Sequence, residues 1–223
     1  MPVMLQDILS GNMSLPLLLL EFITLSLIVL VVLPVHEMAH GYVAYRLGDP
    51  TAKNMGRLTP NPLAHLDPIG TLMIFLLGFG YAKAVPVNPY NFRNPKTGMA
   101  LTALAGPVSN LLMAVLAVGL YRLLSFFITS AYVNSILYWM LILVFASVNV
   151  GLAVFNLLPI PPLDGYRILS VILPDRWIYL IGRYENYLII LVMFLIFTGV
   201  LSTPISFVAN FIFRGILMLF GLA

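Results

Sequence analysis

A long apolar run that ends in two histidines is the feature of this sequence that most constrains its fold. The run begins near Leu15 and reads LPLLLLEFITLSLIVLVVLPVHEMAH. About 20 apolar residues in a helix cross the hydrocarbon core of a bilayer, so the run predicts a membrane-spanning helix. His36 and His40 lie four residues apart, on one face of that helix and about one turn from each other. The sequence therefore places a candidate metal-binding pair inside a hydrophobic segment.

The composition excludes a soluble globular domain and a cysteine-based site. The chain has 223 residues, of which 61% are hydrophobic and 9% charged, whereas soluble domains carry about 25% charged residues. The net charge of +3 is better explained by basic cytoplasmic loops than by nucleic-acid binding. The sequence contains no cysteine, so a bound metal must use His, Asp or Glu.

The apolar segments predict an all-α polytopic membrane protein with about five to six transmembrane helices. The segments long enough to cross, or nearly so, are residues 15–46, 98–121, 132–158, 185–201 and 203–222. A further apolar segment, 69–82, is short, and its length favours a re-entrant element over a span. Together with the turn-rich stretches 58–68 and 85–96, it is expected to form either a small re-entrant element or a membrane-embedded β-hairpin.

The distribution of charge also favours a segment 69–82 that does not cross. Without that crossing, His40 and Asp164 approach the same membrane face, and most loop Lys and Arg residues share one side, with Arg122 opposite. The positive-inside rule then orients the candidate active site toward the cytoplasm. We expect a multi-pass protein of the cell membrane, in a prokaryotic plasma membrane.

His36, Glu37 and His40 together predict a catalytic zinc site. A catalytic zinc keeps three protein ligands and an open position for water, and a neighbouring carboxylate can serve as the general base. The alternative is a chance HExxH pattern in a helix. Because ionisable residues are costly in a membrane helix and are usually functional there, the zinc site is favoured, with Glu37 as general base.

Asp164 is the candidate for the third zinc ligand. It follows the extended stretch PIPPL just beyond the apolar segment 132–158, and Gly165 frees the backbone after it. The alternative is a helix N-cap, because Asp164 precedes the apolar stretch GYRILSVIL and Asp is a good cap. The spacing leaves both interpretations open.

Three ordered motifs resemble those of the site-2 protease family of intramembrane zinc metalloproteases. They are HEMAH at 36–40, GPVSN at 106–110 and NLLP at 156–159 running to LDG at 163–165. The intervening stretches resemble a compact branch of that family without PDZ or CBS domains. The resemblance covers most of residues 30–170. It implies that His36, His40 and Asp164 bind one Zn²⁺ and that Glu37 activates water.

Three asparagines in or near predicted spans are further candidates. By the resemblance, Asn156 matches the family's Asn upstream of the aspartate ligand, and Asn110 closes the GPVSN motif. Asn110, Asn149 and Asn156 could bind the substrate backbone or the oxyanion that forms during hydrolysis. The alternative is packing between helices, which we favour for Asn110 and Asn149.

Two other residues near the predicted site have plainer interpretations. His65 is expected to fix a turn near Asp67 rather than to bind zinc. Pro34 is expected to kink the first helix and to free a carbonyl near Leu30, which either admits water to the site or is an ordinary tolerated proline.

The predicted function is that of an intramembrane zinc metalloendopeptidase that cleaves transmembrane segments of membrane-protein substrates. The expected arrangement is a single protease domain over 1–223, with a catalytic core at about 15–173 and C-terminal helices at about 177–222. The expected partners are a transmembrane protein or peptide substrate and the lipid bilayer, without nucleic acid; a regulatory membrane partner is left open. There are two alternatives to the protease interpretation. One is a transporter or channel for metal ions or protons, and the other is a non-catalytic member of the family.

Overall fold

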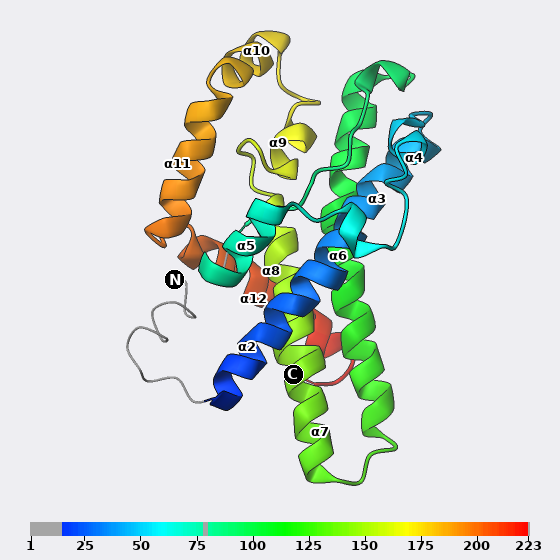
Figure 1. Ribbon diagram of the computed structural model, residues 1–223, viewed down its shortest axis with the longest axis vertical. Helices are drawn as coiled ribbons and strands as arrows, with labels where there is room; N and C mark the ends of the chain where they lie inside the picture. Colours follow the sequence, from blue (N-terminus) through cyan, green and yellow to red (C-terminus); the bar gives the residue numbers. More distant parts are fainter. Residues whose placement is uncertain (1–14, 78–79, 223) are drawn as a thin grey trace. The chain divides into compact units, whose positions relative to one another are not determined.

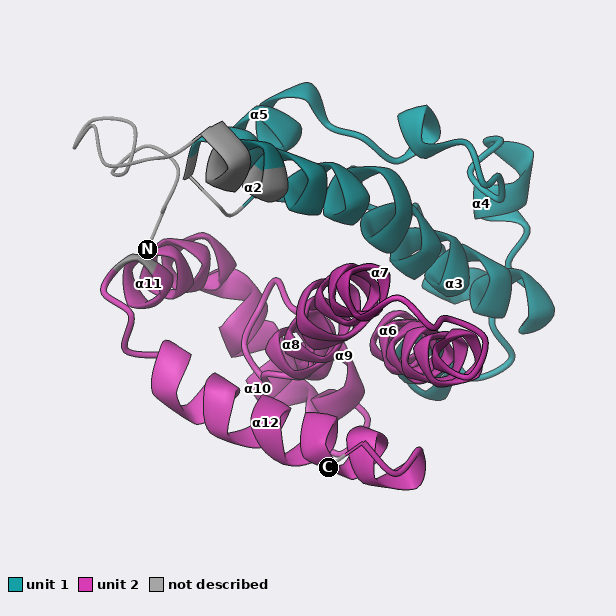
Figure 2. Ribbon diagram, turned by 90° about the horizontal axis from the view of Figure 1, so that it is seen from below, with its two compact units in different colours: residues 1–102 teal, residues 103–223 magenta. Residues whose placement is uncertain are grey.

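The structure of the protein is a computed structural model that describes residues 15–77 and 80–222 (Figure 1). The chain divides into two compact units, residues 1–102 and 103–223 (Figure 2). Within the described ranges every regular element is a helix and none is a strand. The prediction of an all-α protein is therefore confirmed.

In the first unit, the apolar run forms one continuous helical rod (Figure 1). It consists of α2 (Leu15–Leu27), the π-helix η1 (Ile28–Val32) and α3 (Leu33–Arg46). Pro34 has no N–H to donate and lies in the first turn of α3, where a proline is tolerated. The turns before it widen, so that the Leu33 N–H bonds to the Ile28 carbonyl five residues earlier. The structure thus has a π-helix next to Pro34, and the expected kink and free carbonyl near Leu30 stay predictions.

The remaining elements of the first unit are short. They are α4 (Thr51–Asn54), η2 (Pro62–Ala64), α5 (Pro68–Leu77), η3 (Pro89–Asn91) and the first residues of α6 (Pro95–Ser125), which continues into the second unit. The hydrophobic core of this unit includes Leu25 and Val29 from the rod and Ile74 from α5.

Of the two expected alternatives, the β-hairpin is wrong, because residues 68–77 form helix α5 and the described part of 58–96 contains no strand. The Asp67 carboxylate accepts hydrogen bonds from the N–H groups of Ile69 and Gly70, at 3.0 and 2.9 Å. These bonds satisfy donors at the start of a helix, and Pro68 is favourable at the first helical position. Aspartate followed by proline therefore begins a helix here.

The two ends of the segment that contains α5 lie next to each other. The Lys83 N–H donates to the His65 carbonyl at 2.8 Å, and a Cβ atom on Gly70 would lie 2.1 Å from the Tyr81 carbonyl oxygen. Ten helical residues extend only about 15 Å, half of the hydrocarbon thickness. Because its two ends are bonded to each other, the segment cannot cross the bilayer.

The second unit is built from long apolar helices. It contains the rest of α6, α7 (Ala131–Leu137), the π-helix η4 (Tyr138–Ala146), α8 (Ser147–Asn156), α9 (Asp164–Leu169), α10 (Asp175–Arg183), α11 (Glu185–Phe197) and α12 (Ser202–Leu219). Its core joins Ala114, Ala117 and Val118 of α6 with Ala146 and Val150 of the η4–α8 segment. Small side chains let membrane helices approach closely and pack.

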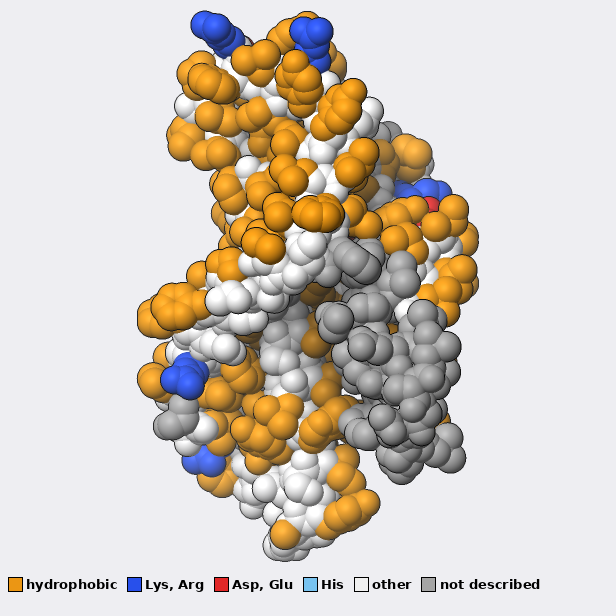
Figure 3. Space-filling model, turned by 90° about the vertical axis from the view of Figure 1, so that its left-hand side faces the viewer, with side chains coloured by type: hydrophobic (Ala, Val, Ile, Leu, Met, Phe, Trp, Pro, Cys, Tyr) orange, Lys and Arg blue, Asp and Glu red, His pale blue; other side chains and the backbone are white. Residues whose placement is uncertain are grey.

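Among the residues that the structure describes, four helices are long and apolar enough to cross a membrane, namely Phe22–Arg46, Pro95–Ser125, Ala131–Asn156 and Ser202–Leu219. A fifth span requires α10 and α11 together, which are bent by 70° at their junction. Hydrophobic side chains dominate the face drawn in Figure 3. Large exposed apolar surfaces of this kind are typical of membrane contact. The chain is a multi-pass membrane protein.

Candidate metal centre

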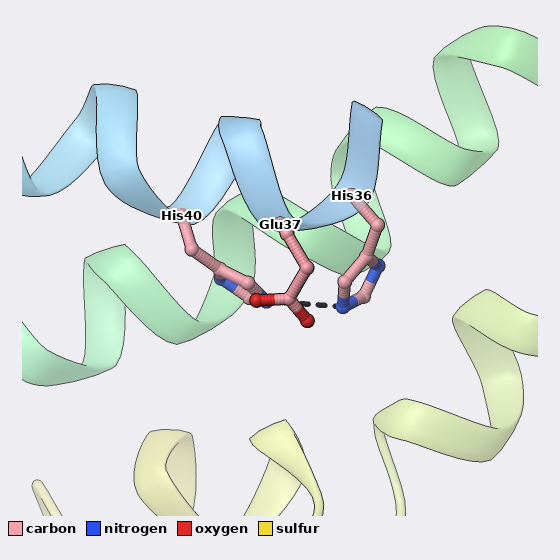
Figure 4. A group of neighbouring side chains, drawn as sticks. All are labelled: His36, Glu37 and His40. Atoms are coloured by element: carbon pink, nitrogen blue, oxygen red, sulfur yellow. Dashed lines mark hydrogen bonds between the residues drawn. The ribbon is translucent and has the colours of Figure 1, made fainter. Parts of the chain in front are cut away.

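Three side chains that could bind a metal project from one stretch of α3 (Figure 4). Candidate ligand atoms of His36, Glu37 and His40 all lie within 4.8 Å of one another. The two histidine side chains are buried, at 6% and 8% exposure, and Glu37 is half-buried. The helical spacing of the HEMAH motif is enough to bring this group together.

A carbonyl from the start of α6 fixes the orientation of His40. The His40 Nδ1 atom lies 2.7 Å from the Thr102 carbonyl oxygen, a distance at which Nδ1–H donates. A proton on Nδ1 leaves the Nε2 lone pair of His40 directed toward His36. Metal-binding histidines commonly have this arrangement, in which the second ring nitrogen donates to a carbonyl or carboxylate.

The two histidines fit a shared zinc ion. Their Nε2 atoms are 3.0 Å apart. Two imidazole nitrogens that bind one tetrahedral zinc at about 2.0–2.1 Å lie roughly 3.3 Å from each other, so only a small adjustment is needed. Buried imidazole nitrogens facing each other beside a carboxylate are a donor set that zinc accepts.

The Glu37 carboxylate is held by the backbone of a distant segment. Its Oε2 atom accepts a hydrogen bond from the Val85 N–H at 2.9 Å, although 48 residues separate the two. Val85 is buried, and its side chain lies close to Gly41, one residue after His40: a Cβ on Gly41 would be 3.1 Å from Val85 Cγ1. We call residues 81–88 the strap; it is irregular in structure and passes over this part of α3.

The strap is anchored on both sides of Val85. Before it, the Lys83 carbonyl accepts a hydrogen bond from the buried Arg57 guanidinium. After it, the Asn88 N–H donates to Asp49 at 2.7 Å. Burial alone would raise the pKa of Asp49, but hydrogen bonds from Thr51, Asn91 and Asn88 outweigh burial and lower that pKa below its usual range. Asp49 thus anchors the strap as a carboxylate.

His65 takes part in this anchoring, and not in the group around His36. Its ring Nε2 lies 2.9 Å from the Thr59 carbonyl, and its own carbonyl accepts from the Lys83 N–H. His65 is fully buried. The interpretation of His65 as a residue that fixes a loop agrees with these contacts.

Asp164 lies in the second unit, and its zinc-binding role stays a prediction. Helix α9 begins at Asp164 with Leu163 in the N-cap position, so the structure does not place Asp164 as the cap. The side chain is buried, at 8% exposure. The backbone at Gly165 lies so close to the Leu157 carbonyl that a Cβ atom on residue 165 would be 2.2 Å from the carbonyl oxygen. Gly165 does not have a positive φ, so missing side-chain volume, rather than backbone freedom, explains this glycine.

The three candidate asparagines differ in their contacts. The side-chain amides of Asn149 and Asn156 donate to the carbonyls of Phe145 and Leu152 on their own helices, at 2.8 and 3.0 Å. Asn110 is buried, and neither atom of its amide group has a hydrogen-bond partner. The amides of Asn149 and Asn156 thus bond within their own helices. Substrate binding by Asn110, Asn149 and Asn156 stays a prediction.

Two backbone groups at the site could not be predicted from the sequence. They are the Thr102 carbonyl, which orients His40, and the Val85 N–H, which binds Glu37. Backbone groups are common to all residue types, so no motif marks them. The pattern of prolines and asparagines in 85–96 indicated only that the chain turns there.

Comparison with known proteins places this site in a family. The model of peptidase family M50 matches residues 24–200. The chain belongs to peptidase family M50. The match spans both the HEMAH motif and Asp164, and it confirms the resemblance to the site-2 proteases and the predicted enzyme class, a zinc-dependent protease.

Individual relatives agree with this assignment. YwhC of Bacillus subtilis, named as a zinc metalloprotease, is 39% identical over 194 residues, which cover 86% of this chain and 84% of YwhC. Rip2 of Mycolicibacterium smegmatis, also named as a zinc metalloprotease, is 34% identical over 140 residues, 60% of this chain and 51% of Rip2. Rip2 of Mycobacterium tuberculosis is 34% identical over 146 residues, 63% of this chain and 54% of that protein. No solved structure matches the chain.

The contact between Val85 and Glu37 leads to a testable prediction for this M50 peptidase. Val85→Pro removes the N–H that binds the carboxylate. A hydrogen bond to a charged group contributes about 1.5–3 kcal/mol, so we expect hydrolysis to slow by roughly tenfold or more because Glu37 loses its fixed position. The measurements are the initial rate of substrate cleavage and the zinc content per chain. We expect the zinc content to be unchanged.

Val85→Ala is the matched control, because it removes the buried side chain and keeps the N–H. We expect its rate to stay closer to that of the unmodified protein than the rate of Val85→Pro. Equal rates in the two variants would show that the side chain, and not the hydrogen bond, matters at this position.

Proposed function

We propose that this zinc metalloprotease cleaves transmembrane segments of other proteins inside the bilayer. The observation that carries the proposal is the position of His36, Glu37 and His40 on a helix, Phe22–Arg46, that is long and apolar enough to cross a membrane. His40 is six residues from the end of this helix, about 9 Å along its axis. Hydrolysis would therefore occur within the membrane, close to one face.

The proposed chemistry follows from the donor groups of the site. When bound by His36 and His40, zinc would act as a Lewis acid and lower the pKa of water toward about 7. Glu37 would accept a proton from the water that adds to the scissile carbonyl. It would then donate this proton to the amine nitrogen as the C–N bond breaks. Thr102 and Val85 would hold His40 and Glu37 in position for these steps.

Asp164 is proposed as the third ligand, on the basis of the family motif and of chain connectivity. Because the segment containing α5 does not cross, the chain that leaves α3 enters α6 from the same membrane side. Helix α6 and the α7–α8 segment then cross once each, in opposite directions. Asp164 accordingly returns to the membrane face where α3 ends. The excess of Lys and Arg in loops on that side supports a cytoplasmic position.

The strap is the proposed binding place for the substrate backbone. A substrate helix must unwind before hydrolysis, because its carbonyls are otherwise bonded within the helix. The Lys83 carbonyl accepts a hydrogen bond from Arg57, the Lys83 N–H donates to the His65 carbonyl, and the Val85 N–H donates to Glu37. Lys83 and Val85 are two residues apart and both direct backbone groups toward the protein, as alternate residues of an extended chain do. We infer that the backbone groups of Ala84, which is exposed, point the other way. An unwound substrate could pair with Ala84 as an added strand.

The location of the cut peptide bond tests this proposal. Membranes that contain the active protein, and membranes that contain its Glu37→Gln variant, would be compared by mass spectrometry for new peptide termini. We expect new termini within transmembrane segments, near their cytoplasmic ends, only with the active protein. Termini confined to soluble loops would refute cleavage inside the bilayer while leaving the protease assignment intact.

A further inference from the structure

Helix α3 has a second chemically distinct face at its C-terminal end. Tyr42, Tyr45 and Arg46 lie roughly 140° to 240° around the helix axis from His40, at 3.6 residues per turn. They are exposed, whereas His36 and His40 are buried. One helix thus directs its metal-binding group inward and an aromatic and basic group outward, within about three turns of each other.

Lys53 of α4 joins this outward face. Helix α4 lies beside the end of α3 (Figure 1). The Lys53 ammonium donates to the Tyr45 hydroxyl at 2.8 Å and lies 4.4 Å from the centre of the Tyr45 ring. Arg46 donates to the Tyr42 hydroxyl at 3.1 Å. Each cation is therefore held against an aromatic ring at the end of a membrane-spanning helix.

The four side chains make a set of hydrogen-bond donors suited to an anion. Because each tyrosine oxygen accepts a hydrogen bond from a cation, its own O–H proton remains available to donate. Arg46 and Lys53 have further N–H donors beyond those used for the tyrosines. Two cations and two hydroxyl groups are therefore exposed at the end of α3 and on α4, as two cation–tyrosine pairs.

Neighbouring acids do not cancel this charge. Asp49 is the only acidic residue within residues 42–57. It is fully buried and accepts hydrogen bonds from Thr51, Asn88 and Asn91. Arg57 is buried as well and bonds to the Lys83 carbonyl. The exposed charge of this stretch is thus +2, from Arg46 and Lys53.

We propose that Tyr42, Tyr45, Arg46 and Lys53 form a binding site for the phosphate of an anionic phospholipid head group. The site lies where the apolar helix ends, which is the depth of lipid phosphates and of interfacial tyrosines. A head group bound there fixes the depth of α3 in the bilayer. If the proposed function holds, it thereby fixes the depth of His36, Glu37 and His40 relative to the substrate.

Lipid binding can be measured without substrate or activity. The full-length protein would be titrated in detergent with phosphatidylglycerol or phosphatidylcholine, and bound lipid would be counted by native mass spectrometry. Each basic residue near an anionic surface contributes about a fivefold gain in affinity, so Arg46→Gln with Lys53→Gln should weaken phosphatidylglycerol binding roughly 30-fold. Phosphatidylcholine binding should change little.

Arg176→Gln with Arg183→Gln is the matched control, since it also removes two exposed cations, from α10. Asp175 and Glu185 lie next to these arginines and offset their positive charge, so the arginines should contribute little to anion binding. We therefore expect phosphatidylglycerol to bind this control variant as it binds the unmodified protein. Tyr42→Phe with Tyr45→Phe keeps the rings and the charge but loses the hydroxyl donors, and it should give a smaller loss. The exchange of Arg46 for Lys and Lys53 for Arg should preserve binding.

Three outcomes would overturn the proposal. One is unchanged phosphatidylglycerol affinity in the Arg46 and Lys53 variant, with zinc content showing that it is folded. The second is an equal loss in the α10 control, which would indicate a general effect of charge. The third is displacement of the lipid by inorganic phosphate at equal concentration, which would indicate a site for free phosphate. None of these outcomes depends on protease activity, so failure here is distinct from failure of the proposed function.

Discussion

Glu37→Gln is expected to reduce the rate of peptide hydrolysis by about 10³-fold while zinc stays bound. The carboxamide cannot accept a proton, and a positioned general base contributes about 10²- to 10⁴-fold to such a reaction. Glutamine has nearly the shape of glutamate, and its carbonyl oxygen can still accept the Val85 N–H bond that holds the side chain. The variant therefore removes proton transfer and leaves the strap in place. Initial cleavage rates and zinc per chain are the two measurements.

Glu185→Gln provides the control for the loss of one carboxylate. Glu185 is exposed at the start of α11, outside the candidate metal centre, and its replacement should leave the rate within a factor of about two. A Glu37→Gln variant that retained more than a tenth of the activity would exclude Glu37 as general base. Loss of zinc from this variant would instead indicate that Glu37 is a ligand.

The second large effect is expected in the zinc content of ligand variants. We expect about one zinc per chain in the purified protein, and loss of it in both His40→Ala and Asp164→Ala, because a catalytic zinc has three protein ligands. His40→Ala removes an Nε2 atom that lies 3.0 Å from that of His36. Metal content by mass spectrometry, on protein whose thermal unfolding is measured in parallel, gives the result.

Asp175→Ala is a matched control for Asp164, because each aspartate is the first residue of a short helix, α10 and α9 respectively. If Asp164 acted only at the start of its helix, both alanine variants would keep their zinc. Zinc lost from Asp164→Ala alone identifies a ligand. Zinc kept in Asp164→Ala would exclude Asp164 as the third ligand.

Much of the fold could be predicted because its signals are local. A run of about 20 apolar residues is long enough to cross a bilayer, and the segments around 15–46, 98–121 and 132–158 contain helices of that length and apolarity in the structure. The segment 185–201 was less decisive: α11 has only 13 residues and reaches the length of a span only with α10, across a 70° bend. Local hydropathy does not show where a helix bends.

The error in 69–82 has a local origin too. The length of the segment favours a re-entrant element, and the structure shows that residues 68–77 of it are helical rather than a hairpin. Asp67 followed by Pro68 is a start signal for a helix, and both bonds from Asp67 form in the structure. The many turn residues on either side drew the prediction toward a hairpin instead.

The apolar helices and the shared face of His36, Glu37 and His40 can be predicted from the sequence, because hydropathy and helical spacing depend on near neighbours. The groups that hold these side chains come from distant parts of the chain and are visible only in the folded protein. The Thr102 carbonyl reaches His40 across 62 residues, and the Val85 N–H reaches Glu37 across 48. These groups belong to the backbone, which is chemically alike at nearly every position, so only the folded path of the chain brings particular ones to the site.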